Sequence, residues 1–559
     1  MRVIKKNKDS KDKNFVPVLR ELDKNIEFLE DIFQDCDDIV SREFTVGVNQ
    51  NHRMYISYVD VMTNEDMIQQ HVLRPLLLEA RLISPDPGDI KKKLFELVLK
   101  GTLSASDIEV KDNLDEAVLA ILSGDTILLI DGVTEFIVIS TKGWPTRGLS
   151  EPPGESVIRG PRVGFVETFR YNTVLLRRSI KDPRLKIKNT QLGERTKTNM
   201  GIAYIDDIVN YKVLEELENR LETIHIDGIF ESGQVEQLIE DDWLSLFPQI
   251  QNTERPDIVS AALLQGKVAL IIDNTPTALI VPTTFNDFMQ FPEDYYERWW
   301  IANLIRWIRL SALIISFTLP SIYIAVASYH PGIIPSNLAI FIAGTRETVP
   351  FPAFIEALIM EITFELLREA GVRLPNQLGS TIGIVGSLII GQAAVEAGLV
   401  SPIMVIIVAL TAIASFSIPS YNFTISFRIL RFIAMVATGF LGLYGLILVV
   451  IATLVHLSVL KSFGVPYLAP IVSGRMTDWK DSIIKAPLPS IKERNSYTAW
   501  GDRKKLRDLR VDIRARTVDI EPKEDGTIDK GKNQPSHTQN LKKPRKIGNK
   551  DNDRGEKDE

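Results

Sequence analysis

The chain of 559 residues has little cysteine, little histidine and no excess of positive charge. A single cysteine, Cys36, excludes an intramolecular disulfide, and the six histidines are scattered without the spacing of metal ligands. Lys and Arg number 65 against 72 Asp and Glu, and the resulting net charge of -7 argues against a general nucleic-acid binder. The sequence therefore predicts no metal site, no cofactor and no nucleic-acid partner.

Long apolar runs are missing from both ends of the chain. None follows the basic segment from Met1 to Asn14, so this segment is not a signal peptide, and almost none occurs after Asp478. The hydrophobic residues, 45% of the whole, are concentrated between Leu310 and Leu460. This segregation predicts an integral membrane protein whose long amino-terminal region stays in the cytosol.

Two stretches of the amino-terminal region occur twice. Ile56–Asp60 reappears as Ile202–Asp206, and Leu122–Thr141 is echoed by Leu264–Thr283 in the same order. A strand, a helical middle and then a β-hairpin, repeated at a nearly constant offset, predict two similar α/β subdomains that arose by duplication.

Asp131 and Asp273 occupy equivalent places in the two predicted hairpins, each between apolar, β-branched runs. This is a turn signal. A carboxylate pair for acid–base chemistry is the alternative, but no His, Ser or Cys lies at a plausible spacing. We therefore expect turn residues and no enzyme.

The segment between the repeats, Gly148 to Ile180, is rich in Pro, Gly and Arg, which forbids a continuous helix through its first half. Guanidinium groups offer forked donors to carboxylates or phosphates. Because neither a P-loop nor a dinucleotide glycine pattern occurs, ion pairing between subdomains or subunits is favoured over a nucleotide site. The candidate interface or binding-loop residues are Arg159, Arg162, Arg177 and Arg178.

An aromatic and positive cluster precedes the apolar region. Such clusters are typical of the cytoplasmic end of a membrane helix. The predicted membrane-interface anchors are Tyr295, Tyr296, Arg298, Trp299 and Trp300. Four spans then follow: Leu310–Ser328, a segment punctuated by Gly379, Gly383, Gly386 and Gly391, Pro402–Ser417, and Phe432–His456.

The helix predicted at Ala353–Ala370 has chemically opposite faces and is long enough to cross a bilayer. It either lines a pore with its acidic stripe toward water or lies in the membrane plane. The pore-lining candidates are Leu358, Glu361, Ile362, Glu365, Arg368 and Glu369. If this helix counts as a span, Arg428 and Arg431 lie on the cytoplasmic side of the membrane and the tail lies outside. If it does not count, these sides are reversed. The sequence therefore does not decide whether the number of spans is odd or even.

The sequence predicts a multidomain protein with an α-helical transmembrane domain and a polar, disordered tail. An amphipathic helix near the amino terminus either docks a partner or packs on its own domain. The predicted boundaries are 1–40 for an amino-terminal helical arm, 41–150 for subdomain 1, 151–298 for the linker and subdomain 2, 299–470 for the transmembrane domain including the helix 353–370, and 471–559 for the tail.

Several of these segments resemble the A subunits of the GerA-type germinant receptors of endospore-forming bacteria. The resemblance runs from about Val40 to Arg475. It is carried by EPPGESVIRGPRVGF with Asn172 and Arg177-Arg178, by TERPD, by FPEDYYERWW, and by PFPAFIEALIMEITFELLREAGVRLP followed by Leu378 to Val395.

The resemblance implies a protein of the inner membrane of the dormant spore, with its soluble domain facing the spore core. It implies two partners, a transporter-like B subunit that holds the nutrient and a lipoprotein C subunit. It also implies a ring-forming, pentameric channel that releases monovalent cations early in germination. Three alternatives remain: an accessory channel of the same membrane that lacks a nutrient-binding partner, a secondary transporter, and a membrane-tethered enzyme.

Overall fold

The computed structural model describes residues 15–46, 52–78, 108–143, 151–152, 154–373, 389–472, 478–482, 484–499, 501 and 504–505. Of the predicted glycine-punctuated span, Gly379, Gly383 and Gly386 lie outside these residues.

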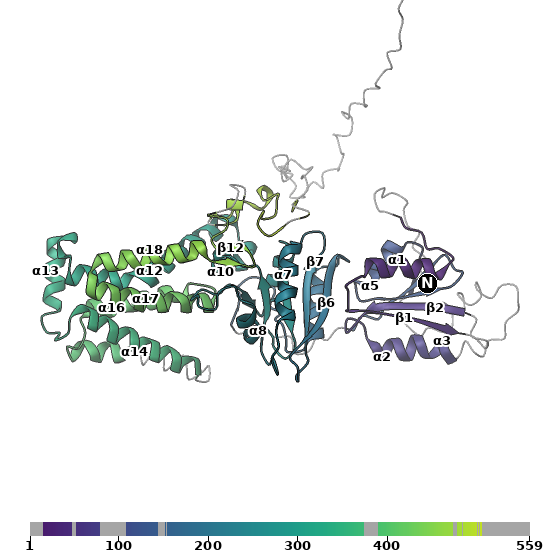
Figure 1. The fold of residues 1–559 in the computed structure, drawn as a ribbon, viewed down its shortest axis with the longest axis horizontal. Coiled ribbons are helices and arrows are strands. Elements are labelled where there is room, and N and C mark those ends of the chain that lie inside the picture. Colours follow the sequence, from purple (N-terminus) through teal and green to yellow (C-terminus); the bar gives the residue numbers. More distant parts are fainter. Residues whose placement is uncertain are drawn as a thin grey trace, which may run out of the picture. The chain divides into compact units, whose positions relative to one another are not determined.

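Subdomain 1 is an antiparallel sheet with helices on both faces (Figure 1). Its elements are α1 (Leu22–Ile32), β1 (Ile39–Val46), β2 (His52–Val59), α2 (Glu65–Ile68), a π-helical turn (Gln69–Leu73), α3 (Arg74–Leu78), β3 (Ile108–Lys111), α5 (Leu114–Ile121), β4 (Thr126–Ile130) and β5 (Phe136–Ile139). The strand order is β1-β2-β4-β5-β3. Because side chains alternate along a strand, Ile127 and Leu129 face α1 and α5, while Leu128 and Ile130 face α2 and α3. A strand buried on both faces is apolar throughout.

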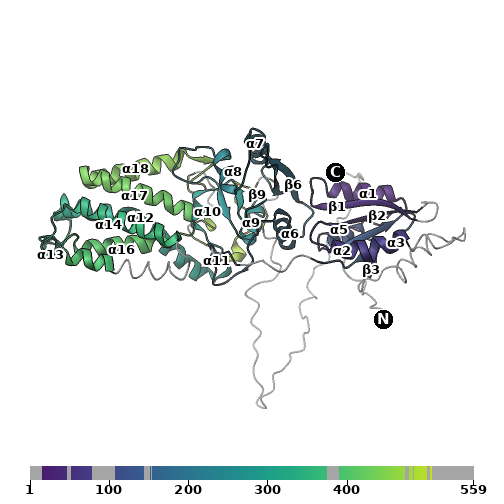
Figure 2. The same ribbon diagram turned by 90° about the horizontal axis from the view of Figure 1, so that it is seen from below.

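Subdomain 2 repeats this arrangement. Its elements are α6 (Phe169–Ser179), β6 (Leu185–Leu192), β7 (Thr198–Ile205), α7 (Tyr211–Glu222), α8 (Ser232–Ile239), β8 (Gln251–Thr253), α9 (Pro256–Leu263), β9 (Val268–Ile272) and β10 (Ala278–Val281). The strand order β6-β7-β9-β10-β8 is that of subdomain 1 with each strand replaced by its counterpart. In β9, Leu270 and Ile272 face α7 and α8, and Ala269 and Ile271 face α6 and α9 (Figure 2). The prediction that the two subdomains share one fold is confirmed.

The two hairpin aspartates are turn residues, as predicted. Asp131 and Asp273 follow β4 and β9 directly. Each carboxylate also accepts a hydrogen bond from the backbone at the start of a helix: Leu22 N lies 3.4 Å from Asp131 Oδ1, and Phe169 N lies 3.0 Å from Asp273 Oδ1. Carboxylates are favourable at helix amino termini, where amide N–H groups lack partners. The duplication therefore preserved a helix-positioning contact.

The sequence predicted that the helix of the amino-terminal arm either docks a partner or packs on its own domain, and the structure shows the second arrangement. Helix α1 packs on the sheet of its own subdomain, where Leu22 and Leu29 are fully buried. Its amphipathic pattern is that of a helix with one buried face, which was the alternative to partner docking.

Over the described ranges, the helical part contains five helices that lie alongside one another and several shorter ones. In chain order they are α10 (Phe285–Met289), α11 (Glu293–Tyr296), α12 (Trp299–Ser328), a 3-10 turn (Pro331–Ile333), α13 (Ser336–Thr345), α14 (Ala353–Arg373), α16 (Pro402–Phe416), α17 (Tyr421–Leu441) and α18 (Leu443–Val459). Among the described residues, α12 and α17 have the length and the apolar composition to cross a membrane, and α13, α16 and α18 are shorter apolar helices. The amphipathic helix begins at Ala353 as predicted and extends to Arg373.

The predicted single span at Phe432–His456 is wrong, because Gly442 divides it. Gly442 has φ +60° and ends α17, and α18 begins at the next residue. A side chain strongly disfavours this conformation, whereas glycine adopts it freely, so the chain can reverse there. Two antiparallel helices therefore replace one predicted span.

Contacts along the bundle give the direction of each helix. At the end nearest subdomain 2, Ser426 Oγ on α17 donates to Leu246 O at 2.5 Å, and Ser245 Oγ lies 2.9 Å from His456 Nε2 on α18. At the opposite end, the Tyr329 hydroxyl after α12 donates to Gly439 O on α17. Helices α12 and α17 thus run away from subdomain 2, and α18 returns to it.

The predicted disordered tail begins too early. Residues 478–499, which we call the strap, return along subdomain 2 after the last helix of the bundle. Lys485 N donates to Asn303 Oδ1 at 2.7 Å, and Thr498 Oγ1 donates to Gln265 O at 2.8 Å. Ala499 is buried in the cluster beneath α6 and α9. Few apolar residues are needed here, because backbone hydrogen bonds and one small side chain fix the strap.

Removal of residues 522–559, which lie outside the described residues, should leave assembly unchanged because they contain almost no apolar residues to bury. Truncation from residue 478 onward should instead reduce the yield of folded protein, since it removes Ala499 from a buried cluster. Size-exclusion chromatography of the two detergent-solubilised truncations checks both expectations. Equal, full yields from the two truncations would show that the strap is dispensable.

Candidate functional site

The charged side of α14 faces α17 within the same chain. Glu361 is 2% exposed, and its carboxylate lies 2.9 Å from the Arg431 guanidinium, which is 1% exposed. Glu365 lies 2.9 Å from Arg428 and 3.4 Å from Arg431. Arg368 donates to Glu365 Oε1 at 3.1 Å and to Ser415 Oγ on α16 at 3.2 Å. We call the side chains of Glu361, Glu365, Arg368, Arg428 and Arg431 the charge cluster.

A second buried carboxylate fixes the other end of α14. Glu356 is fully buried and accepts two hydrogen bonds from Ser401, one from the backbone N–H and one from the hydroxyl, both at 2.5 Å. Arg346 Nε lies 3.5 Å from its other oxygen. Because Ser401 caps α16 and Ser415 near the other end of α16 bonds Arg368, α14 and α16 run in the same direction, toward subdomain 2.

The exposed side of α14 is apolar over most of its length. Ile359, Ile362 and Leu366 are 40%, 46% and 67% exposed, and Leu358 is half-buried. Glu369 is the exposed acidic residue of the predicted pore-lining set. The structure therefore separates that set: Glu361, Glu365 and Arg368 lie against α16 and α17, while Ile362 and Glu369 lie on the outer face.

The arginines of α17 are the part of this site that the sequence did not assign. From the sequence, Arg428 and Arg431 bear only on which side of the membrane each loop lies. They are three residues apart, so they share a face of α17. Acidic residues at 361 and 365 and basic residues at 428 and 431, each set at helical spacing within an apolar region, are the signal that could have paired the two helices.

A second buried ion pair joins the two subdomains. Arg177 on α6 donates to both oxygens of Asp38, from Nε at 2.6 Å and from Nη2 at 2.7 Å, and Nη1 donates to Leu185 O at 2.8 Å. Both side chains are 1% exposed or less. The Cys36 thiol lies beside them, 3.7 Å from Leu185 O. Burial raises the pKa of this thiol, and the nearby Arg177 partly offsets the increase.

The other arginines of the linker make more exposed contacts. Arg159 lies 3.4 Å from Glu297, and Arg162 lies 3.9 Å from Glu151. Arg178 is an exposed residue at the end of α6. Of the four predicted interface residues, only Arg177 is fully buried in an intersubdomain contact.

The predicted membrane anchors divide into two groups. Trp300 is 70% exposed and stacks on Trp299, and Arg298 is exposed, as lipid-facing residues would be. Tyr295 and Tyr296 instead make hydrogen bonds within the chain: the Tyr295 hydroxyl donates to Gln290 Oε1 at 2.9 Å and the Tyr296 hydroxyl to Asp257 Oδ2 at 2.7 Å. Their anchoring role stays a prediction.

Comparison with known proteins gives consistent matches. Residues 27–497 match the family described as "Bacillus/Clostridium GerA spore germination protein". The chain is 42% identical to the spore germination protein GerLA of Bacillus cereus, over 87% of this chain and 98% of the relative. It is 44% identical to the uncharacterized membrane protein YfkQ of Bacillus subtilis, over 87% and 92%. It is also 31% identical to the crystal structure of the N-terminal domain of the A subunit of the Bacillus megaterium spore germinant receptor GerK3, with a TM-score of 0.38 over 49% of this chain and 99% of that domain.

Proposed function

Because the chain belongs to the GerA family of spore germination proteins, we propose that it is the A subunit of a nutrient germinant receptor and forms an oligomeric channel for monovalent cations in the spore inner membrane. A transporter-like B subunit and a lipoprotein C subunit would be its partners, and the soluble subdomains would face the spore core. The relatives are named as germination proteins rather than as enzymes, which points to a non-enzymatic role.

The direction of the helices supports a multi-pass arrangement with both soluble ends on one side. The chain leaves subdomain 2 at α12 and returns to it after α18, where the strap bonds Gln265. The chain would therefore cross the membrane an even number of times. Arg428 and Arg431 lie toward the subdomain 2 end of α17, so positive residues and tail share the inner side, which agrees with the positive-inside tendency. The division at Gly442 adds one crossing to the predicted number, which supports this arrangement.

One observation carries the channel proposal: α14 neutralises its charges inside its own subunit and presents an apolar face outward. Several copies of this face around an axis, five if the family resemblance extends to stoichiometry, would form a narrow apolar constriction. Such constrictions close a pore by excluding water. Glu369, on the outer face near the inner end, would then favour cations over anions at the mouth.

Replacement of Ile362 by alanine should increase cation leak before any nutrient is added. Each copy loses three carbon atoms from the proposed constriction, so the closed state loses ~2 kcal/mol per copy and leak should increase about tenfold or more. Potassium flux from liposomes that contain the purified protein measures this. The matched control is Ile451→Ala on α18, also an exposed isoleucine of the bundle, which should leave leak unchanged. Equal flux in wild type and Ile362→Ala, with normal assembly, would contradict a constriction at this residue.

An accessory channel without a nutrient-binding partner is a second candidate. The similarity to YfkQ, which is named only as an uncharacterized membrane protein, does not distinguish this candidate from the receptor. A gene for a transporter-like B subunit next to the gene for this chain would favour the receptor, and co-purification of that B subunit with this chain would establish the partnership.

A further inference from the structure

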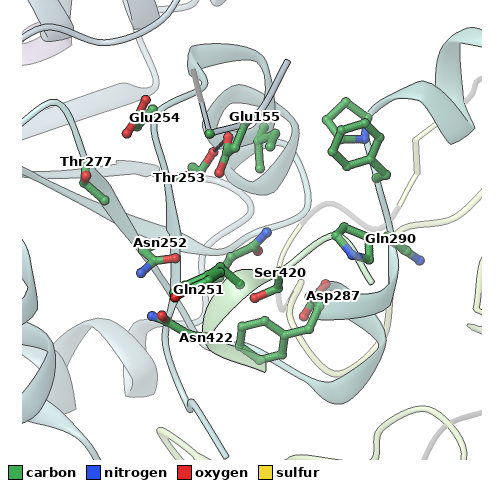
Figure 3. Close-up of a pocket in the computed structure, with 17 residues that line it drawn as sticks. Glu155, Gln251, Asn252, Thr253, Glu254, Thr277, Asp287, Gln290, Ser420 and Asn422 are labelled. Atoms are coloured by element: carbon green, nitrogen blue, oxygen red, sulfur yellow. Dashed lines mark hydrogen bonds between the residues drawn. The ribbon is translucent and has the colours of Figure 1, made fainter. Parts of the chain in front are cut away.

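Two polar cavities meet where subdomain 2 packs against the start of α17. The first, of about 240 Å³, lies between β8, the α10–α11 connection and the loop before α17 (Figure 3). The second, of about 410 Å³, lies between α8 and the segment Ser245–Pro248. Asn252, Thr277 and Asn422 line both, and the first is also lined by polar groups such as Gln251, Gln290 and Ser420. These are neutral oxygen ligands of the kind that hard cations take.

The described residues that line the two cavities include carboxylates but no Lys, Arg or His. The carboxylates are Glu155, Glu254 and Asp287 in the first cavity and Glu231, Glu236 and Glu240 in the second. Asp287 is neutralised by Lys267 at 2.7 Å, outside the lining. Glu155 accepts a hydrogen bond from Thr253 Oγ1 at 2.7 Å. The described residues that line the two cavities therefore include more acidic groups than basic ones.

Glu236 is the unusual member of this group. It is 7% exposed and lines the second cavity, and its carboxylate makes no hydrogen bond or ion pair to any residue that the structure describes. A buried carboxylate without a partner is costly, so it takes up either a proton or a cation.

The surroundings of two of these carboxyl groups raise their pKa values. Burial, and then Glu240 and Glu231, raise the pKa of Glu236 to about 8. Burial raises the pKa of Glu155 to about 7, with Glu254 and Asp257 adding to the increase and Arg255 opposing it. His456 shares a hydrogen bond with Ser245, which lines the second cavity.

We propose that the second cavity binds a monovalent alkali cation, held by amide and hydroxyl oxygens with Glu236 as its charge partner. A divalent ion fits less well, because the described residues include no group of three or more His, Cys, Asp or Glu that could hold a metal ion. The proposal deepens the channel function and rests on it. Ile425 of the second cavity is one turn before Arg428, which pairs with Glu365 on α14, so the site would concentrate cations beside the inner end of the proposed pore helix.

Thermal unfolding of the full-length protein in detergent, in KCl against N-methylglucamine chloride at equal ionic strength, tests the proposal. At pH 8, KCl should raise the apparent unfolding midpoint by about 5 °C when its concentration is a hundredfold the dissociation constant. The apparent affinity for K⁺ should weaken about tenfold for each pH unit below the pKa of Glu236, because a proton then competes. In N-methylglucamine chloride the midpoint should fall from pH 6 to pH 8.5, since the folded state binds more protons than the unfolded state and loses them as the pH increases.

Glu236→Gln should abolish the K⁺ effect, and the exposed control Glu222→Gln on α7 should retain it. If a glutamine variant does not fold, Asn422→Ala removes an oxygen ligand without changing a carboxylate, and it should weaken K⁺ binding. A K⁺ effect that persists in Glu236→Gln, equal midpoints in the two salts, or stabilisation by Mg²⁺ or methylammonium alone would each overturn the proposal. Failure of the wild-type protein to conduct cations in liposomes would instead count against the channel, because the unfolding experiment requires no flux.

Discussion

Replacement of Arg431 by leucine is expected to lower the unfolding midpoint of the detergent-solubilised protein by about 10 °C, because it leaves Glu361 buried without a positive partner, at a cost of ~3–5 kcal/mol. Glu361 has no other ion-pair partner among the described residues, whereas Glu365 keeps Arg428 and Arg368. The variant should therefore mainly weaken the contact between α14 and α17. Differential scanning fluorimetry measures the midpoint directly.

A double variant separates loss of the pair from loss of packing. Glu361→Gln combined with Arg431→Leu removes both charges and should recover part of the lost stability, since no uncompensated charge remains. The exposed control Arg298→Leu should change the midpoint by no more than about 1–2 °C. If Arg431→Leu unfolds at the wild-type temperature, the pair does not hold α14 against α17.

The second large effect is expected at the contact between the subdomains. Arg177→Leu leaves Asp38 buried without its bidentate partner, and the interface should lose ~3–5 kcal/mol. Cys36 lies in this interface and is the only cysteine of the chain, so its alkylation under native conditions reports opening of the interface. Because 1.4 kcal/mol is a factor of ten, the alkylation rate should increase by about a hundredfold or more.

The same helix offers a matched control for this experiment. Arg170 also reaches subdomain 1, where its guanidinium lies 3.3 Å from Asp60, but both side chains are partly exposed. Arg170→Leu should therefore change the alkylation rate of Cys36 less than tenfold. Equal rates in Arg170→Leu and Arg177→Leu would show that burial of the Asp38 pair adds nothing to the interface.

The parts of the fold that the sequence predicted are those determined by local pattern. The hairpins at Leu122–Thr141 and Leu264–Thr283 combine two short apolar strands with a turn residue between them, and both formed as expected. The amphipathic helix starts at Ala353 because two prolines precede it and prevent an earlier start. Residues within about twenty positions of one another carry all of this information.

The parts that the sequence did not predict depend on residues far apart in the chain. Arg431 pairs with Glu361 across 70 positions of sequence, and the chemistry of either residue alone is equally consistent with a water-filled pore. The strap is polar because hydrogen bonds to α12 and to subdomain 2, with little apolar burial, hold it, so its composition resembles that of a disordered tail. The division at Gly442 was missed because a glycine within an apolar run is compatible with a continuous membrane helix.

The residues that follow α18 affect the order in which the protein can be completed on the ribosome. Subdomain 2 is translated before any helix of the bundle, yet two of its buried clusters contain Phe463 and Ala499, which emerge only after α18. Until the last helix is inserted, the newly made subdomain exposes the apolar surface that these residues later cover. Nascent chains whose insertion fails would retain that surface and remain substrates for chaperones and proteases. The fold thus links quality control of the soluble region to successful insertion of the helices.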